Sequence, residues 1–106
     1  MKEEYILLGV IEMELVREGN AIIGRNEDGK IVAEITFPQG HDENIVIANH
    51  TYTDPSLRGQ GIAGRLVDKM VEEMEKEGKK IHATCPYIVR KFKEDPKKYD
   101  FINADK

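Results

Sequence analysis

The sequence predicts an α/β domain in which a mixed, mostly antiparallel sheet packs against one main central helix, with a short helix near the C-terminus. Two observations support this class. Short runs of β-branched residues alternate with turn residues in the first half, and one long stretch with helical periodicity dominates the second. A third observation concerns size: the 106 residues contain no repeat, low-complexity segment or linker. Residues 1–106 are therefore expected to form a single domain.

Turn residues divide the first half into strands. Gly19-Asn20 separates two apolar runs, and Asn26–Gly29 has the composition of a hairpin turn in which Gly29 takes a positive φ. Pro38-Gln39-Gly40 forms a further break. The predicted strands of this antiparallel meander are Met13–Arg17, Ala21–Arg25, Lys30–Phe37 and Asn44–Thr53. For Tyr5–Met13, a strand and a short helix both remain open.

The second half changes period. Its apolar residues repeat with helical spacing and form one stripe: Ile62, Ala63, Leu66, Val67, Met70, Val71 and Met74. The charged residues of this segment, including Lys69 and the acidic Glu72, Glu73 and Glu77, are expected on the solvated side. Gly78 is expected to end the helix. Lys80–Thr84 then predicts a short strand, and Pro86 suits the first turn of a short helix over Tyr87–Phe92.

Composition excludes several function classes. The net charge is −4, and no Lys/Arg-rich stripe with interleaved aromatic residues is present, which argues against nucleic acid as the main partner. No apolar run is long enough to span a bilayer, and no signal peptide is recognisable. The lone Cys85 cannot form an internal disulfide, in keeping with a reducing compartment. We therefore expect a cytoplasmic protein without a membrane partner.

The most informative segment is Asp54–Ala63, which lies between a predicted strand and the main helix. Gly59 and Gly61 allow the backbone to approach a ligand closely, and a helix N-terminus offers unpaired amides and a positive dipole end. Arg58 adds a possible charge-assisted contact to an anion. The spacing alone fits a tight strand-to-helix turn equally well, so both interpretations stay open at this point.

Two other phosphate-binding motifs fit poorly. Gly59–Gly64 matches the dinucleotide fingerprint G-x-G-x-x-G literally, but that motif expects the first strand of a βαβ unit and an acidic residue about 20 positions later. Here the loop follows a meander in mid-chain. The P-loop is excluded because no Gly-Lys-Ser/Thr is present.

The run Arg58-Gly59-Gln60-Gly61-Ile62-Ala63 closely resembles the Arg/Gln-x-x-Gly-x-Gly/Ala motif of the GNAT N-acetyltransferase superfamily. Asn20–Ile102, including His50-Thr51 and Cys85-Pro86, further resembles a very short GNAT-like subfamily. The resemblance implies that this loop holds the pyrophosphate of acetyl-CoA. It also implies that the acetyl-pantetheine arm lies in a cleft between splayed strands Ile45–Thr53 and Lys80–Thr84.

By the same resemblance, backbone groups near Thr51 and Thr53 would pair with the pantetheine arm. A strand N–H there would also polarise the thioester carbonyl, as an oxyanion hole does. These contacts are made by main chain, so the side chains give little information about them.

Two side chains are candidates for chemistry. Cys85 precedes Pro86 at a predicted helix start, where the dipole favours a thiolate that could exchange an acyl group with a thioester. The alternative is a buried structural cysteine. His50 could act as a general base toward an amine or toward Cys85, or it could simply be a hydrogen-bonded strand residue. Tyr87 and Tyr99 are expected to be packing residues with hydroxyls at the surface. The three histidines and one cysteine show no metal-ligand spacing.

Three functions follow from these features. The first is an acetyl-CoA-dependent N-acetyltransferase acting on an amine, directly or through Cys85. Full-size GNAT enzymes have two helices that wall the acceptor site, and Met13–Phe37 leaves no room for them, so a bulky acceptor such as a protein is favoured. The second is a non-catalytic module that binds or senses acetyl-CoA, since the superfamily's common catalytic glutamate has no counterpart on Asn44–Thr53. The third is a structural domain whose glycine loop is only a turn.

Overall fold

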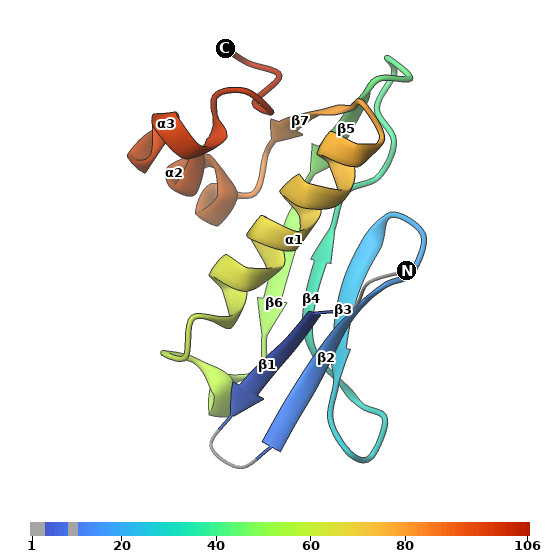
Figure 1. Ribbon diagram of the computed structural model, residues 1–106, viewed down its shortest axis with the longest axis vertical. Coiled ribbons are helices and arrows are strands. Elements are labelled where there is room, and N and C mark those ends of the chain that lie inside the picture. The colour runs from blue at the N-terminus through green and yellow to red at the C-terminus, as the bar shows by residue number, and fades with distance from the viewer. Residues whose placement is uncertain (1–3, 9–10) are drawn as a thin grey trace.

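The computed structural model describes residues 4–8 and 11–106, with side chains described from Met13 onward. Seven strands, a 3-10 turn and three helices make up this part of the chain (Figure 1). The strands are β1 (Glu4–Leu8), β2 (Ile11–Arg17), β3 (Ala21–Arg25), β4 (Ile31–Thr36), β5 (Ile45–Ala48), β6 (His50–Thr53) and β7 (Lys80–Ala83). The helical elements are η1 (Pro55–Leu57), α1 (Ile62–Lys76), α2 (Pro86–Glu94) and α3 (Pro96–Tyr99).

The strands form two sheets. β1, β2, β3, β4 and β6 pair antiparallel in that order, whereas β5 and β7 pair in parallel. The predicted mixed, mostly antiparallel arrangement is confirmed. The segment 5–13, for which the sequence left strand and helix open, is extended wherever it is described, since it contains β1 and the start of β2.

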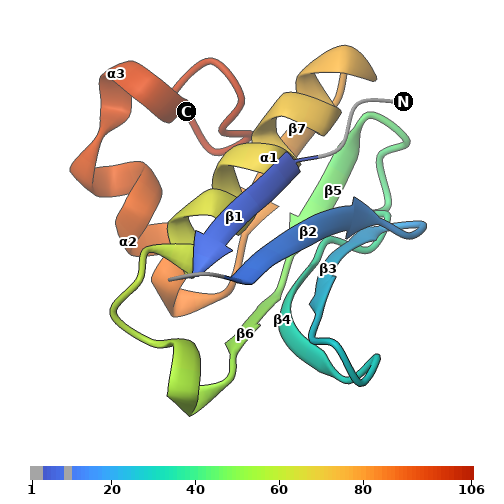
Figure 2. The same ribbon diagram turned by 60° about the horizontal axis from the view of Figure 1, so that its bottom comes forward.

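One extended segment changes partner at Asn49. Before it, β5 pairs with β7, and after it, β6 pairs with β4 (Figure 2). The amides of Thr84 and Cys85 both donate to the Ala48 carbonyl, at 2.9 and 3.1 Å, which closes the paired region. The sequence placed a cleft along the whole of Ile45–Thr53 and Lys80–Thr84. That extent is wrong, because Ile45–Ala48 is paired with Lys80–Ala83 and the strands separate only beyond Ala48.

Helix α1 covers one face of the antiparallel sheet and contacts β3, β4, β6 and β7 (Figures 1 and 2). Its apolar stripe is buried as predicted, apart from the half-buried Ala63. Leu15, Ile22, Ile35 and Phe37 face it from the sheet with no exposed surface. The left-handed Gly78, at φ 70°, follows the helix end at the predicted position.

Two charged residues of α1 depart from the prediction of a solvated face. Lys69 is only 3% exposed and Glu73 only 7%. Glu73 tolerates burial because the Arg17 guanidinium lies 3.4 Å from its carboxylate and the Lys76 ammonium 3.6 Å away. Helical periodicity did not reveal this, since the compensating Arg17 comes from a distant strand.

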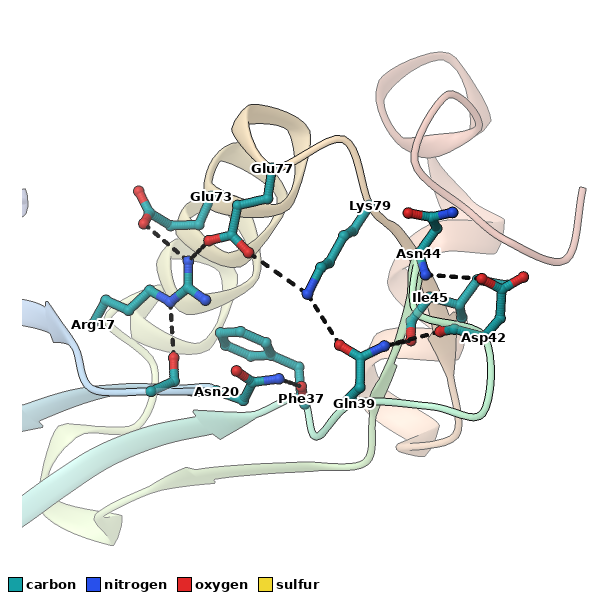
Figure 3. A network of polar contacts seen from close by, with 11 residues as sticks. Arg17, Asn20, Phe37, Gln39, Asp42, Asn44, Ile45, Glu73, Glu77 and Lys79 are labelled. Carbon is teal, nitrogen blue, oxygen red and sulfur yellow. Dashed lines mark hydrogen bonds and ion pairs between the residues drawn. The ribbon is translucent and has the colours of Figure 1, made fainter.

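A polar network joins the C-terminal end of α1 to the sheet and to the loop after β4 (Figure 3). Arg17 pairs with Glu77 as well as Glu73, and its guanidinium lies 5.5 Å from the Phe37 ring centre. Lys79 donates to the Gln39 side chain at 3.0 Å, and Gln39 in turn donates to the Asp42 and Ile45 carbonyls at 2.9 and 3.1 Å. The loop that leads into β5 is thereby tied to the helix end.

The C-terminal segment adds a second layer beside β7. Helix α3 was not predicted, because four residues are too few to show a period. Tyr99 is 2% exposed, stacks on Phe92 at 5.0 Å and donates to Asp68 of α1 at 2.8 Å. The expectation that the Tyr99 hydroxyl lies at the surface is therefore wrong. After α3, the chain pairs with the outer edge of β7 through Ile81 and Asn103.

Within residues 4–8 and 11–106, no helix is both long enough and apolar enough to cross a membrane.

Candidate acetyl-CoA site

The loop between β6 and α1 begins with a local cap. The Asp54 carboxylate accepts from the Ser56 amide at 3.0 Å and from the Ser56 hydroxyl at 2.7 Å. These bonds, the amide contact first, hold the pKa of Asp54 below its ordinary value. Pro55 fixes the first position of η1, and the turn then delivers the chain into the glycine-containing segment.

Gly59 and Gly61 both adopt left-handed backbone conformations, with φ of 84° and 77°. A Cβ added to either residue would meet nothing within 4 Å. The glycines are therefore required by the backbone conformation, and the space in front of them is open. This combination suits a loop over which a ligand can lie close to the main chain.

Gly61 is also the N-cap of α1 and offers no side-chain cap. The first amide of the helix with an intrahelical acceptor is that of Arg65, which donates to the Gly61 carbonyl at 3.2 Å. The amides of Ile62, Ala63 and Gly64 precede it and have no acceptor inside the helix. Together with the helix dipole, they form a site suited to a phosphoryl group.

A hollow of about 230 Å³ opens at this point of the surface. It joins the loop and the first turn of α1 to the end of β6 and the start of α2. The residues that line it are Thr53, Leu57, Arg58, Gly59, Gly61, Ile62, Ala63, Gly64 and Tyr87. Six of the predicted cofactor-binding residues therefore share one surface hollow. Gln60 and Thr51 are not among its lining residues.

The main chain of β6 continues from this hollow toward Cys85. Tyr52 pairs with Glu34, and the Asp54 amide donates to the Val32 carbonyl at 2.8 Å. The peptide groups of Tyr52 and Asp54 therefore point toward β4. The intervening Thr51 and Thr53 have peptide groups that point away from β4, because hydrogen-bonding direction alternates along a strand. β6 is the last strand of its sheet, so this edge is available to an extended ligand.

Cys85 lies at the N-cap of α2, where the chain leaves β7. Its sulfur is 3.6 Å from the Thr51 hydroxyl, and the residue is 8% exposed. Burial is the largest single influence and favours the neutral thiol. The Thr51 hydroxyl and the backbone amides of Ile88, Tyr87 and Thr51 together outweigh it, so the pKa of Cys85 is lowered. The thiol is thus both buried and biased toward the thiolate, which combines the two alternatives that the sequence left open.

His50 lies on the other side of the sheet. It stands opposite Thr36, in the row that contains Tyr52 and Glu34, whereas Thr51 belongs to the row of Ile35 that faces α1. His50 is exposed, and no hydrogen bond joins it to Cys85. The structure therefore brings Thr51 and Cys85 together but places His50 on the opposite face.

Comparison with known proteins decides the family. A family model described as GCN5-related N-acetyl-transferase matches residues 22–102, about three quarters of the chain. This chain belongs to the GCN5-related N-acetyltransferase family. Members of this family, GNAT for short, generally use acetyl-CoA as the co-substrate of acetyl transfer. No curated protein sequence matches the chain.

Solved structures agree on the fold. A GCN5-like protein from Staphylococcus aureus is 28% identical, with a TM-score of 0.62 over 77% of this chain and 80% of that one. A GNAT-family protein from Desulfovibrio desulfuricans is 16% identical, with a TM-score of 0.55 over 72% of this chain and 52% of its own. Ribosomal-protein-alanine N-acetyltransferase from Brucella melitensis is 23% identical, with a TM-score of 0.53 over 85% and 65%. This chain thus spans most of the first protein but only about half to two thirds of the other two.

The GNAT motif identified the loop, but sequence analysis missed two features of the hollow. Tyr87 packs against the core as expected, but it also contributes to the wall of the hollow, which was not predicted. Burial, ahead of its charged neighbours, raises the pKa of Tyr87. Gly64 was not identified as a lining residue either. Both arise from the contact of α2 with the first turn of α1, a tertiary arrangement that no local pattern encodes.

No group of three or more His, Cys, Asp or Glu side chains able to hold a metal ion occurs in the described part of the chain.

Proposed function

We propose that this protein binds acetyl-CoA and transfers its acetyl group to an amine presented by a macromolecule. The observation that carries the proposal is that three features lie next to one another in space. The first is the uncapped N-terminus of α1 behind the left-handed glycine loop, the second is the edge of β6 with its outward peptide groups, and the third is the Cys85 thiol. Such a series matches a ligand with a diphosphate, an amide-bearing arm and a thioester, in that order.

In this proposal the amides after Gly61 hold the diphosphate, and Arg58 adds a charge-assisted contact. The peptide groups of Thr51 and Thr53 pair with the pantetheine arm. The Thr51 amide, which faces Cys85, would also stabilise negative charge that develops on the thioester oxygen. Gln60 completes the loop without entering the hollow.

Two routes of transfer are compatible with this placement. In the covalent route, the Cys85 thiolate attacks the thioester carbonyl, a new C–S bond forms, and CoA leaves as a thiolate that takes up a proton. The acceptor amine then forms a C–N bond, Cys85 is released, and the amine proton passes to a base. In the direct route, the amine attacks acetyl-CoA from the outer face of the sheet, and His50 accepts its proton.

The acceptor class rests on the connections of the sheet. β2, β3 and β4 follow one another through short turns, so no helix intervenes between them to wall off the outer face. An open face suits a side chain or terminus carried by a large molecule better than a small amine that must be enclosed.

The first test is calorimetric titration with acetyl-CoA, followed by intact and Cys85-resolved mass measurement of the same sample. We expect saturable binding. An acetyl adduct on Cys85 would support the covalent route and would justify an acceptor screen. Absence of binding would overturn the proposal and favour a purely structural domain.

Gly61→Asp is predicted to abolish acetyl-CoA binding, because its carboxylate would project into the space where the diphosphate is placed. The change also costs backbone energy, since Gly61 is left-handed. Gly19→Asp is the matched control: it has a φ of 61°, open surroundings and a position in the β2–β3 turn at the other end of the sheet. If a folded Gly61→Asp protein kept the wild-type affinity, the loop assignment would be wrong.

Cys85→Ala is predicted to leave acetyl-CoA affinity within about threefold of wild type, because one sulfur contact contributes little to binding. The variant should lose any covalent acetyl label, as judged by peptide mass mapping. If an acetyl label still accumulated on the Cys85→Ala protein, the covalent route through Cys85 would be wrong.

A second candidate is a non-catalytic acetyl-CoA-binding module, favoured by the burial of Cys85 and by its separation from His50. Steady release of CoA in the presence of an acceptor separates the two, because a binding module would form at most one adduct per molecule.

A further inference from the structure

One cation of α2 lies beside the first turn of α1. Lys91 belongs to α2, is half-buried and folds back over the first turn of α1. A Cβ placed on Gly64 would lie 3.4 Å from the Lys91 ammonium and 3.8 Å from the Tyr87 hydroxyl. The Lys91 ammonium and the Tyr87 hydroxyl therefore lie within ordinary van der Waals distance of a side chain at position 64.

The surroundings of Lys91 provide no neutralising partner. No ion pair joins it to a carboxylate in the described part of the chain. Asp68, one turn along α1 from Gly64, is already engaged by Lys98 at 3.2 Å and by the Tyr99 hydroxyl at 2.8 Å. The other charged groups near Tyr87 are Arg90 and Glu94, both on the same helix as Lys91.

Two helix ends lie near the Lys91 ammonium. Lys91 belongs to the last turn of α2, where a cation is favourable, and it also lies beside the first turn of α1. The first turn of α1 has three amides without intrahelical acceptors and carries the positive end of the helix dipole. The Lys91 ammonium and the first-turn amides of α1 therefore bring positive charge together at a point that an anion from outside the chain would neutralise.

We propose that Lys91 is a ligand-binding residue that pairs with the diphosphate of acetyl-CoA beside the first turn of α1. The inference rests on the proposed function and extends it to a residue outside the glycine motif. Because the ammonium lies over Gly64, a phosphoryl group bonded to the first-turn amides is within its reach. The diphosphate would then be held from two sides, by main-chain amides of α1 and by a charge from α2.

The test compares three ligands by calorimetry: acetyl-CoA, its 3′-dephospho form, and acetyl-pantetheine, which lacks the diphosphate. Lys91→Met is expected to weaken the first two by the same factor, about tenfold, and to leave acetyl-pantetheine unchanged. Lys91→Arg should retain most of the affinity. Lys93→Met, which removes an exposed charge from the same helix, is the matched control and should bind as wild type does.

Each alternative result is decisive. Equal loss for acetyl-pantetheine would show that Lys91 only supports the packing of α2, and unchanged affinity for acetyl-CoA would exclude the contact. A loss confined to the ligand with the 3′-phosphate would overturn the assignment to the diphosphate. If the wild-type protein and Lys91→Met bound acetyl-CoA with the same affinity, only this inference would fall. A wild-type protein that bound none of the ligands would instead overturn the proposed function.

Discussion

At the scale of single residues, Cys85 illustrates how one side chain depends on several elements. Cys85 follows β7 in the chain, is the N-cap of α2 and contacts the Thr51 hydroxyl of β6. Burial disfavours its thiolate, but the Thr51 hydroxyl and three amides favour it more strongly. The chemistry of this thiol is therefore a property of the junction of three elements, and removing one contact should change it measurably.

Thr51→Val is predicted to raise the pKa of Cys85, because it removes the hydroxyl that favours the thiolate and keeps the side-chain volume. In the wild-type protein, the rate of alkylation by iodoacetamide should reach half its maximum at a lower pH than for an ordinary cysteine, because the pKa of Cys85 is lowered. In the variant the midpoint should move upward. Thr53→Val, two residues along the same edge, is the control and should not shift it. An unchanged midpoint in Thr51→Val would show that the amides alone set the acidity.

Residue-level features were predictable where the backbone itself is the cause. The left-handed conformations of Gly29 and Gly78 follow from turn and helix-end chemistry that is local in sequence. The burial of Glu73 was not predictable, because it depends on Arg17, 56 positions away. The proposed role of Lys91 was not predictable for the same reason, because it depends on Gly64, which lies on another helix.

At the scale of elements, α1 has two ends with different roles. Its N-terminus is uncapped and faces the hollow, whereas its C-terminus is fixed by Arg17 and lies next to the Lys79–Gln39 contact (Figure 3). Anchoring one end of a helix firmly restricts the orientation of its free amides at the other. The polar network thus supports the site without contacting it.

Arg17→Ala is predicted to destabilise the protein by about 1–2 kcal/mol, because it leaves the nearly buried Glu73 carboxylate with only the exposed Lys76 as its partner. Lost stacking on Phe37 adds to the effect. Chemical denaturation measures the change. Arg25→Ala breaks the exposed pair with Glu18 and should leave stability almost unchanged. Equal stability of both variants would mean that the network contributes nothing beyond a surface ion pair.

Helices and strands with a clear hydrophobic periodicity were predicted from the sequence. Strands whose limits depend on their pairing partners were not. The apolar stripe of α1 and the hairpins of β2, β3 and β4 are local patterns, and each appears where expected. The division of one extended run into β5 and β6 is different. No local pattern near Asn49 indicates that the extended segment pairs with β7 before this residue and with β4 after it. This change of partner depends on the position of β7, which follows α1 in the chain.

At the scale of the whole molecule, charge is unevenly distributed. The chain has 16 basic and 20 acidic residues, a net charge of −4, and would repel a polyanion at long range. The proposed diphosphate site nevertheless combines Arg58, Lys91 and the positive end of α1. Local attraction and global repulsion therefore oppose each other, and salt affects them in opposite directions.

Acetyl-CoA affinity is predicted to weaken as salt increases. At physiological ionic strength charges separated by more than about 8 Å are largely screened, so the net charge contributes little and the contacts of Arg58 and Lys91 dominate. Raising potassium chloride from about 50 to about 500 mM should increase the Kd by about three- to tenfold. Acetyl-pantetheine, which lacks the phosphates, should bind equally well at both concentrations. If acetyl-CoA instead bound more tightly at high salt, repulsion by the whole molecule would be the larger effect. The cations around the loop could not then be what holds the diphosphate.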